Sequence, residues 1–258
     1  MRINKLTTFH LRLIGMLTMV IDHVGYFLFP RLTILRIIGR ISFPIFAFLC
    51  AEAMHYSSKK ERYIIVLAAF DIVISLVIYL FTGQNFGSVF SCLAISALII
   101  YLLQNKRIWV RILSVIPFMY AIFASLHFTP IVMQYGIYGV LMIVGFYLIR
   151  RILTIYGEKN NIDNTSFNFP FYYSLCSTLY LVALSLISYN GSSFFETYLP
   201  SGGMSFRIQS YAFMSGIFIL FYSGKKGYSS KWFKIFNYAF YPLHVLIILL
   251  IQIIMQMI

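Results

Sequence analysis

Residues 11–29 read LRLIGMLTMVIDHVGYFLF, and residues 32–55 read LTILRIIGRISFPIFAFLCAEAMH. Each run is long enough to cross the hydrocarbon core of a bilayer as a helix, which takes about 20 residues. Neither run alternates strictly between apolar and polar residues, as a strand of a membrane barrel does. The pair therefore predicts two antiparallel transmembrane helices, joined side by side by a tight turn at Pro30 and Arg31.

Apolar runs of spanning length recur along the whole chain. The hydrophobic fraction of the 258 residues is 60%, the charged fraction is 10% and the mean hydropathy is +0.85. These values exclude a soluble domain of this size and predict an all-α, polytopic integral membrane protein built as one domain over residues 1–258. About nine transmembrane helices are expected, over residues 11–29, 32–55, 62–82, 88–104, 108–127, 131–149, 170–190, 207–223 and 235–257.

The basic residues predict the orientation. With a cytoplasmic N-terminus and nine crossings, sixteen of the 20 Lys and Arg residues lie in cytoplasmic segments, and only Arg31 and Arg207 lie outside. This asymmetry is typical of the positive-inside rule and places the C-terminus outside, with residues 156–169 as a cytoplasmic loop. Because topology explains the net charge of +13, no nucleic-acid partner is expected.

The cysteines and the N-terminus carry no further signal. Cys50, Cys92 and Cys176 lie within apolar segments without CxxC spacing, which is typical of small buried side chains, so neither a disulfide nor a metal site is expected. The first apolar run lacks a cleavage site, and we expect it to remain in the mature protein.

Ionisable residues interrupt the first two helices. Asp22 and His23 are adjacent in the first, and the second carries Arg36, Arg40, Glu52 and His55. Such groups are unfavourable inside a bilayer unless they are paired or line a wet cavity. At about 1.5 Å per residue, His23 and Arg40 reach similar depths on neighbouring helices. Since Asp71 and His244 also reach mid-depth, the sequence predicts a polar pocket among the helices over 11–29, 32–55, 62–82 and 235–257.

Purely structural explanations compete with this pocket. Asp22 could form a buried ion pair with either arginine, Glu52 and His55 could be solvated at the interface, and Asp71 could hydrogen-bond a neighbouring helix. The structural explanation is weakest for His23, because a carboxylate and two arginines surround it.

Five stretches carry a resemblance to a known family. They are IDHVGYFLFP (21–30), RIIGRISFPIFAFLCAEAMHYS (36–57), QYGIYGVLMIVGFYLIR (134–150), FYSGKKG (221–227) and FNYAFYPLHVLIILLI (236–251). In this order they resemble the TraX family, whose membrane proteins are associated with N-terminal acetylation of conjugative pilin, within the wider group of transmembrane acyltransferases. The chain departs from the pattern at Gln134, where an acidic residue is expected.

The resemblance implies an acetyl-CoA-dependent N- or O-acetyltransferase in the bacterial cytoplasmic membrane. It would move an acetyl group from cytoplasmic acetyl-CoA to an amine or hydroxyl of a peptide, pilin or surface glycan. His23 would act as general base, Asp22 would orient its ring, and Arg40 would stabilise the developing oxyanion. A route through acetyl-histidine also remains open.

The other expected site residues fall into two groups. Residues expected to bind the donor are Arg36, Arg40, Glu52, His55, Lys59, Lys60, Tyr241 and His244, and those expected to bind the acceptor are Asp71, Asn85 and Tyr135.

Two other functions compete with acetyl transfer. One is a proton-coupled transporter or flippase in which Asp22, His23, Glu52 and Asp71 relay protons. The other is a non-enzymatic assembly factor whose buried charges only fix helix packing. No P-loop or Rossmann fingerprint is present, so nucleoside-triphosphate chemistry is not expected.

Overall fold

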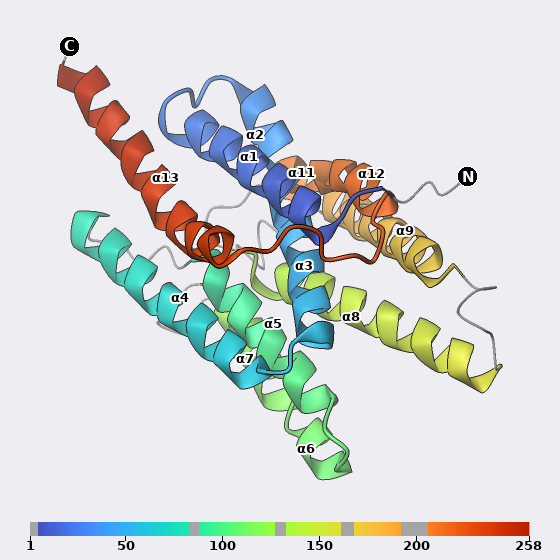
Figure 1. The fold of residues 1–258 in the computed structure, drawn as a ribbon. Helices are drawn as coiled ribbons and strands as arrows, with labels where there is room; N and C mark the ends of the chain where they lie inside the picture. The colour runs from blue at the N-terminus through green and yellow to red at the C-terminus, as the bar shows by residue number, and fades with distance from the viewer. Residues whose placement is uncertain (1–4, 83–87, 127–132, 161–167, 192–205, 258) are drawn as a thin grey trace. The chain divides into compact units, whose positions relative to one another are not determined.

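A computed structural model describes residues 5–82, 88–126, 133–160, 168–191 and 206–257 (Figure 1). Across these ranges the regular structure is helical, apart from one isolated parallel bridge between Leu6 and Tyr222. The prediction of an all-α fold is confirmed.

The structure divides into two compact units, and the single domain predicted over residues 1–258 stays a prediction. Unit 1 comprises residues 1–46, 163–185 and 208–258, and unit 2 comprises residues 47–162 and 186–207. Each unit is described by itself.

Unit 1 is organised around a helical hairpin. Helices α1 (Thr8–Phe27) and α2 (Thr33–Gly39) pack side by side, followed by the first residues of α3 (Ser42–Tyr56). Most of α9 (Phe169–Asn190) follows, and then come α11 (Phe206–Gln209), the 3-10 helix η1 (Ser210–Met214), α12 (Ser215–Leu220) and α13 (Lys231–Met257). Helix α13 also packs on α1.

The first backbone amides of α1 form hydrogen bonds with residues distant in sequence. The amides of Thr8 and Phe9 donate to the carbonyls of Lys225 and Lys226 at 2.9 and 3.2 Å. The first amides of a helix have no partner within it, so these bonds satisfy two of them. They also tie the start of α1 to the segment that leads into α13.

The second predicted helix, 32–55, is divided into α2 and α3. The division falls at Arg40 and Ile41, and α3 restarts at Ser42 with Pro44 as its third residue. A proline is tolerated in a first helical turn because that amide needs no partner there, but its ring clashes with the carbonyl four residues earlier. That carbonyl belongs to Arg40, so the chain breaks at Arg40 instead of bending at Pro44.

Unit 2 contains the remainder of α3, α4 (Lys60–Thr82), α5 (Val89–Leu103), α6 (Ile108–Ile112), α7 (Val115–Ser125) and α8 (Gly136–Lys159). Its core lies where α3, α5 and α8 pack together. There the rings of Phe48 and Phe146 meet edge to face, with their centroids 5.5 Å apart. Ile100 and Ile143 are fully buried in the same core.

Three other predicted elements differ from the structure. The helix expected over 108–127 is divided into α6 and α7, with Pro117 in the first turn of α7. The segment 207–223 forms three short pieces, α11, η1 and α12, in place of one helix. Helix α8 continues to Lys159, so the loop expected over 156–169 begins later, and residues 161–167 lie outside the described ranges.

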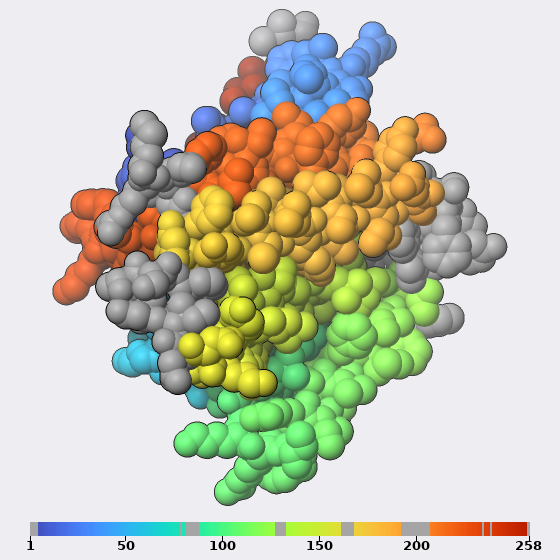
Figure 2. All heavy atoms as spheres, turned by 90° about the vertical axis from the view of Figure 1, so that its right-hand side faces the viewer, coloured from blue at the N-terminus to red at the C-terminus, as the bar shows by residue number. Residues whose placement is uncertain are grey.

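Five helical stretches within the described residues are long and apolar enough to span a membrane: Thr33–Tyr56, Ile108–Ser125, Gly136–Lys159, Phe169–Asn190 and Ala239–Gln256. The apolar α5 is shorter, with 15 residues. Large apolar side chains are exposed along these helices; α9, in gold in Figure 2, exposes Tyr172, Leu179 and Leu186. Such surfaces are typical of lipid-facing helices. The nine crossings and their orientation remain predictions.

Candidate functional site

Asp22 of α1 is paired with two arginines of the α2 segment. Its Oδ2 accepts a hydrogen bond from Nη1 of Arg36 at 2.7 Å, and its Oδ1 accepts another from Nη2 of Arg40. Arg40 also donates from Nη1 to Oε1 of Gln209 at 3.2 Å and from Nε to the carbonyl of Arg36 at 3.3 Å. One carboxylate therefore accepts hydrogen bonds from two guanidinium groups.

Gly39 makes this arrangement sterically possible. A Cβ atom built on Gly39 would lie 2.2 Å from Oδ1 of Asp22 and 2.3 Å from its Cβ. Real side chains do not approach that closely, so only glycine allows the carboxylate to lie against the end of α2. This gives a physical reason for the glycine in the stretch Gly39-Arg40.

His23 faces α13. Its Nδ1 lies 2.7 Å from Nε2 of His244, and the two rings are stacked with centroids 4.9 Å apart. On the other side of His244, Nδ1 lies 2.7 Å from the carbonyl oxygen of Phe240. Tyr241 stands edge-on to both imidazoles.

These contacts assign the protons of two neutral imidazoles. A carbonyl only accepts, so Nδ1 of His244 carries the proton and its Nε2 is an acceptor. Nδ1 of His23 therefore donates to His244, and the unprotonated nitrogen of His23 is Nε2. This leaves His23 with a lone pair oriented away from its partner, which is the state that a general base requires.

The sequence predicts that Asp22 orients the ring of His23, whereas the ring contact in the structure is with His244. Successive side chains on a helix point about 100° apart. Asp22 therefore meets α2 while His23 meets α13.

A second polar cluster lies in unit 2. Glu52 of α3 accepts an ion-paired hydrogen bond from Nη1 of Arg150 of α8, and both side chains are buried. Nη2 of Arg150 donates to the hydroxyl of Tyr56 at 2.7 Å. The glutamate expected to contact the donor is therefore bound to an arginine that the sequence assigned only to topology.

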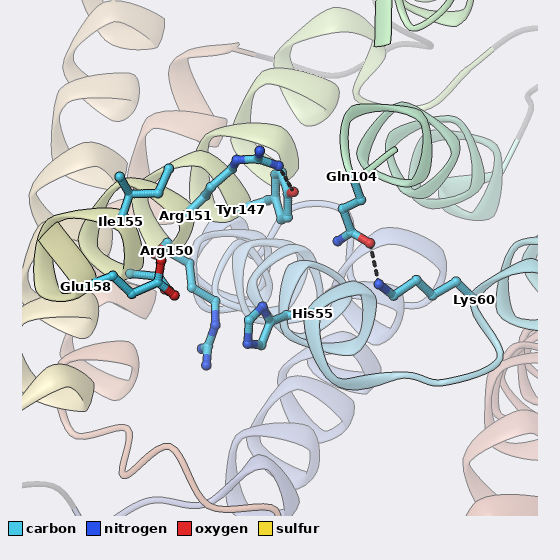
Figure 3. Close-up of a pocket in the computed structure, with 9 residues that line it drawn as sticks. His55, Lys60, Gln104, Tyr147, Arg150, Arg151, Ile155 and Glu158 are labelled. Carbon is cyan, nitrogen blue, oxygen red and sulfur yellow. Dashed lines mark hydrogen bonds between the residues drawn. The ribbon is translucent and has the colours of Figure 1, made fainter. Parts of the chain in front are cut away.

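A pocket of about 370 Å³ lies beside this ion pair (Figure 3). Nζ of Lys60 donates to Oε1 of Gln104 at its edge, and Nε2 of Gln104 donates to the carbonyl of Met54 at 3.0 Å. The lining residues include His55, Lys60, Gln104, Arg150, Arg151 and Glu158. His55 and Lys60, both expected to bind the donor, thus line one cavity.

At the start of α4, outside the segment expected to span the membrane, the hydroxyl of Tyr101 donates to Oε1 of Glu61 at 2.8 Å. The backbone amide of Glu61 itself and then this hydroxyl lower the pKa of the Glu61 carboxyl.

The remaining predicted residues lie apart from these contacts. Lys59 is exposed, and its amide donates to Oγ of Ser57. Asp71 accepts a hydrogen bond from Oγ of Ser88 at 2.6 Å. Tyr135 precedes α8 in a left-handed conformation with φ of 64°, which non-glycine residues adopt uncommonly. Asn85 lies outside the described residues.

The predicted residues are thus described as two clusters, one in each unit. Arg36, Arg40, Asp22, His23, Tyr241 and His244 belong to unit 1, and Glu52, His55, Lys59, Lys60, Asp71 and Tyr135 belong to unit 2. Among the described residues, no group of three or more His, Cys, Asp or Glu side chains is arranged to hold a metal ion.

Three residues of the two clusters were not predicted as site residues from the sequence. Gln209 is uncharged and lies in a segment predicted as one plain helix, so no sequence signal identified it. Arg150 and Arg151 were marked as basic residues at a helix end, and only their packing distinguishes them from topology signals.

Comparison with known protein families confirms the resemblance. A family model described as "TraX protein" matches residues 8–252, nearly the whole chain. The chain belongs to the TraX family. This TraX-family chain is also 47% identical over 55 residues to the uncharacterized protein RP591 of Rickettsia prowazekii, a match that covers 21% of this chain and 22% of that protein. No solved structure matches.

Proposed function

We propose that this TraX-family protein is a membrane-embedded acetyltransferase that moves an acetyl group from acetyl-CoA to an amine or hydroxyl acceptor. The acceptor would be a peptide or pilin N-terminus or a surface glycan. The observation that carries the proposal is the hydrogen-bonded chain from His23 Nδ1 through His244 to the carbonyl of Phe240, with distances of 2.7 Å at each link. It holds one imidazole as a base with a fixed free nitrogen.

The chemistry follows from that nitrogen. As the acceptor nitrogen or oxygen attacks the carbonyl carbon of the thioester, Nε2 of His23 takes the acceptor proton. The resulting imidazolium keeps its Nδ1 hydrogen bond to His244, which acts as the orienting group that a carboxylate supplies in a catalytic triad. When the tetrahedral intermediate collapses, the carbon–sulfur bond breaks and the proton passes from His23 to the leaving thiolate.

The arginine pair suits the charge that develops in this reaction. Arg36 and Arg40 both approach Asp22, the residue next to His23, and guanidinium groups in such a position stabilise an anion that develops nearby. Of the two, Arg36 is more accessible, with 25% of its side chain exposed against 6% for Arg40. We therefore propose that Arg36 contacts the oxyanion and that Arg40 holds Arg36 in position.

The proposal includes the nine-crossing arrangement in the bacterial cytoplasmic membrane, with the N-terminus inside and the C-terminus outside. The basic segments would then face the cytoplasm, where acetyl-CoA is available, and the donor would enter from that side. The five apolar spans and the charge asymmetry support this arrangement.

The test is acetyl transfer by purified protein in lipid nanodiscs. Acetyl-CoA labelled in the acetyl group is incubated with N-terminal peptides and glycan acceptors, and labelled product is measured. His23→Ala should abolish transfer, while His10→Ala, a histidine at the exposed start of α1, should leave it unchanged. If the label stays on CoA with every amine and hydroxyl acceptor while a proton gradient drives solute uptake, the protein is a transporter.

A cellular measurement identifies the acceptor. Mass spectrometry of membrane peptides and surface polymers, with and without the protein, should show one acetyl group gained by the acceptor. Loss of that gain in a His23→Ala strain, with normal protein abundance, would separate catalysis from an assembly role.

A further inference from the structure

The pocket in unit 2 presents two positive charges that neutral groups hold in place. Nη1 of Arg151 donates to the hydroxyl of Tyr147 at 3.1 Å and to the carbonyl of Leu103 at 3.3 Å. Nζ of Lys60 donates to the amide oxygen of Gln104. Figure 3 shows the Arg151–Tyr147 and Lys60–Gln104 contacts as dashed lines.

Neither charge has a salt-bridge partner among the described residues, although the carboxylate of the adjacent Glu61 interacts with Lys60 at longer range. Within the described residues, salt bridges join Asp22 to its two arginines and Glu52 to Arg150, and no carboxylate oxygen lies within 4.0 Å of Lys60 or Arg151. Burial of part of these side chains without a counter-charge is unfavourable unless an anion completes the site.

Arg150 forms the fixed wall of the pocket. Its guanidinium is held by Glu52 and by the hydroxyl of Tyr56, and its carbon Cζ lies 4.7 Å from the centroid of the Tyr56 ring. Because this arginine is already neutralised and oriented, Lys60 and Arg151 remain as the cations that can turn toward a ligand. Glu158 is the one acid among the residues that line the pocket, and it is exposed at the end of α8.

The size and donor set favour one ligand chemistry. A pocket of about 370 Å³ has the size of a small-ligand site. A guanidinium and an ammonium in one pocket suit a phosphate ester, with its several oxygens, better than they suit a single carboxylate. Arginine binds phosphate in a forked manner, and lysine acts as a point charge. Gln104 and Tyr147 are neutral, so little free energy is lost when a phosphate oxygen replaces them as hydrogen-bond partners of Lys60 and Arg151.

We infer that the pocket formed by Lys60, Gln104, Tyr147, Arg150 and Arg151 is a binding site for a phosphate ester. Two sources carry this chemistry: a soluble nucleotide-like ligand, including the phosphorylated part of an acyl donor, and the headgroup of an anionic phospholipid. Only the identification with the acyl donor rests on the proposed acetyl transfer. The site itself requires no transfer reaction.

The test measures binding by the full-length protein in phosphatidylcholine nanodiscs. Adenosine 3′,5′-bisphosphate and inorganic pyrophosphate are titrated by calorimetry, and retained lipid is measured by native mass spectrometry after exposure to phosphatidylglycerol. Lys60→Gln and Arg151→Gln should each weaken binding about tenfold or more, because each removes a charge-assisted contact. The matched control is Arg107→Gln, an exposed arginine outside the pocket that lies over the ring of Trp109.

The outcomes separate the sources and can overturn the inference. Binding of the soluble phosphates that Lys60→Gln weakens identifies a soluble ligand, and retention of phosphatidylglycerol that the same variant loses identifies a lipid headgroup. The inference is overturned if neither probe binds, or if Lys60→Gln and Arg151→Gln bind as Arg107→Gln does. Thermal unfolding of each variant without ligand checks that it is folded. Lys60→Gln should disturb folding least, because Lys60 is the first residue of α4.

The variant His23→Ala distinguishes the two proposals. Because His23 lies in unit 1, this variant should bind the phosphate probes with wild-type affinity. Phosphate binding without acetyl transfer by the wild-type protein would leave the pocket in place and refute only the proposed reaction.

Discussion

Nδ1 of His23 lies 2.7 Å from Nε2 of His244, a residue 221 positions further along the chain. The hydrogen bond joins the first and last described helices of unit 1 and fixes which nitrogen of His23 is free. Its partner is a second imidazole, held in turn by the carbonyl of Phe240. In the proposed mechanism, His244 would take the orienting role that the sequence predicts for Asp22.

Substitutions at His244 should show how much the activity depends on the hydrogen bond that orients the His23 ring. His244→Phe keeps a ring but leaves Nδ1 of His23 without an acceptor, and we expect a fall in kcat of at least about 10²-fold. His244→Gln, whose amide oxygen can accept, should retain more activity than His244→Phe. Steady-state transfer rates with saturating acetyl-CoA measure both, and a His244→Phe protein with a wild-type kcat contradicts the orienting role.

Gly39 should tolerate no side chain. Gly39→Ala would force the Asp22 carboxylate away from Arg36 and Arg40, since the new Cβ would lie 2.2 Å from Oδ1. Breaking such a partly buried pair is expected to lower the free energy of unfolding by about 3–5 kcal/mol.

The matched control is Gly157→Ala, because a Cβ at this helical glycine of α8 meets no heavy atom within 4 Å. It should leave stability unchanged or raise it by up to about 1 kcal/mol through helix propensity. Thermal unfolding in detergent compares the two, and equal midpoints would disprove the steric role of Gly39.

Glu52→Gln should destabilise unit 2. The change leaves the Arg150 guanidinium buried without its counter-charge, which typically lowers stability by about 3–5 kcal/mol. Replacing both partners, as Glu52→Gln with Arg150→Met, should recover part of the loss because no unpaired charge remains. Chemical unfolding followed by tryptophan fluorescence checks both variants, with Glu158→Gln, at an exposed acid, expected to show no measurable change.

The two arginines around Asp22 should respond differently to the same substitution. Arg40→Lys removes the bonds to Gln209 and to the carbonyl of Arg36 in a buried setting, whereas Arg36→Lys keeps a charge at a more exposed position. We expect Arg40→Lys to lower the unfolding midpoint more, and Arg36→Lys to lower kcat with a smaller change in the midpoint. The opposite ranking would reverse the assigned roles.

Single cysteines test the crossing pattern. In a variant without native cysteines, Lys59→Cys and Lys225→Cys should react with a membrane-impermeant maleimide only after the cells are opened. Asn190→Cys and Gln256→Cys should react in intact cells. Labelling of Lys225→Cys and Gln256→Cys from the same side would contradict a final crossing by α13.

Local pattern was sufficient for much of the fold. The apolar runs predicted helices where α1, α4, α5, α9 and α13 lie, with ends that differ by a few residues. Pro44 predicted a kink in the helix over 32–55, and the structure has a break at Arg40 and Ile41 instead. The break before Val115 was missed, because hydropathy continues unchanged through it, and Pro117 in the first turn of α7 was the available signal.

The candidate site was only partly predictable. The cost of placing charge in an apolar run singled out Asp22, His23, Arg40 and Glu52 from the sequence, because that cost depends on local composition. Their partners depended on packing: Asp22 with Arg36 and Arg40, His23 with His244, and Glu52 with Arg150.

The sequence by itself determined that this chain is helical, rich in membrane-spanning segments and marked by ionisable groups that need partners. Only the tertiary structure decided which partner each group has. A helix directs neighbouring side chains to different faces, so Asp22 and His23, adjacent in the chain, meet α2 and α13 respectively. Contacts across 221 residues depend on how those faces pack, and no local pattern contains that information.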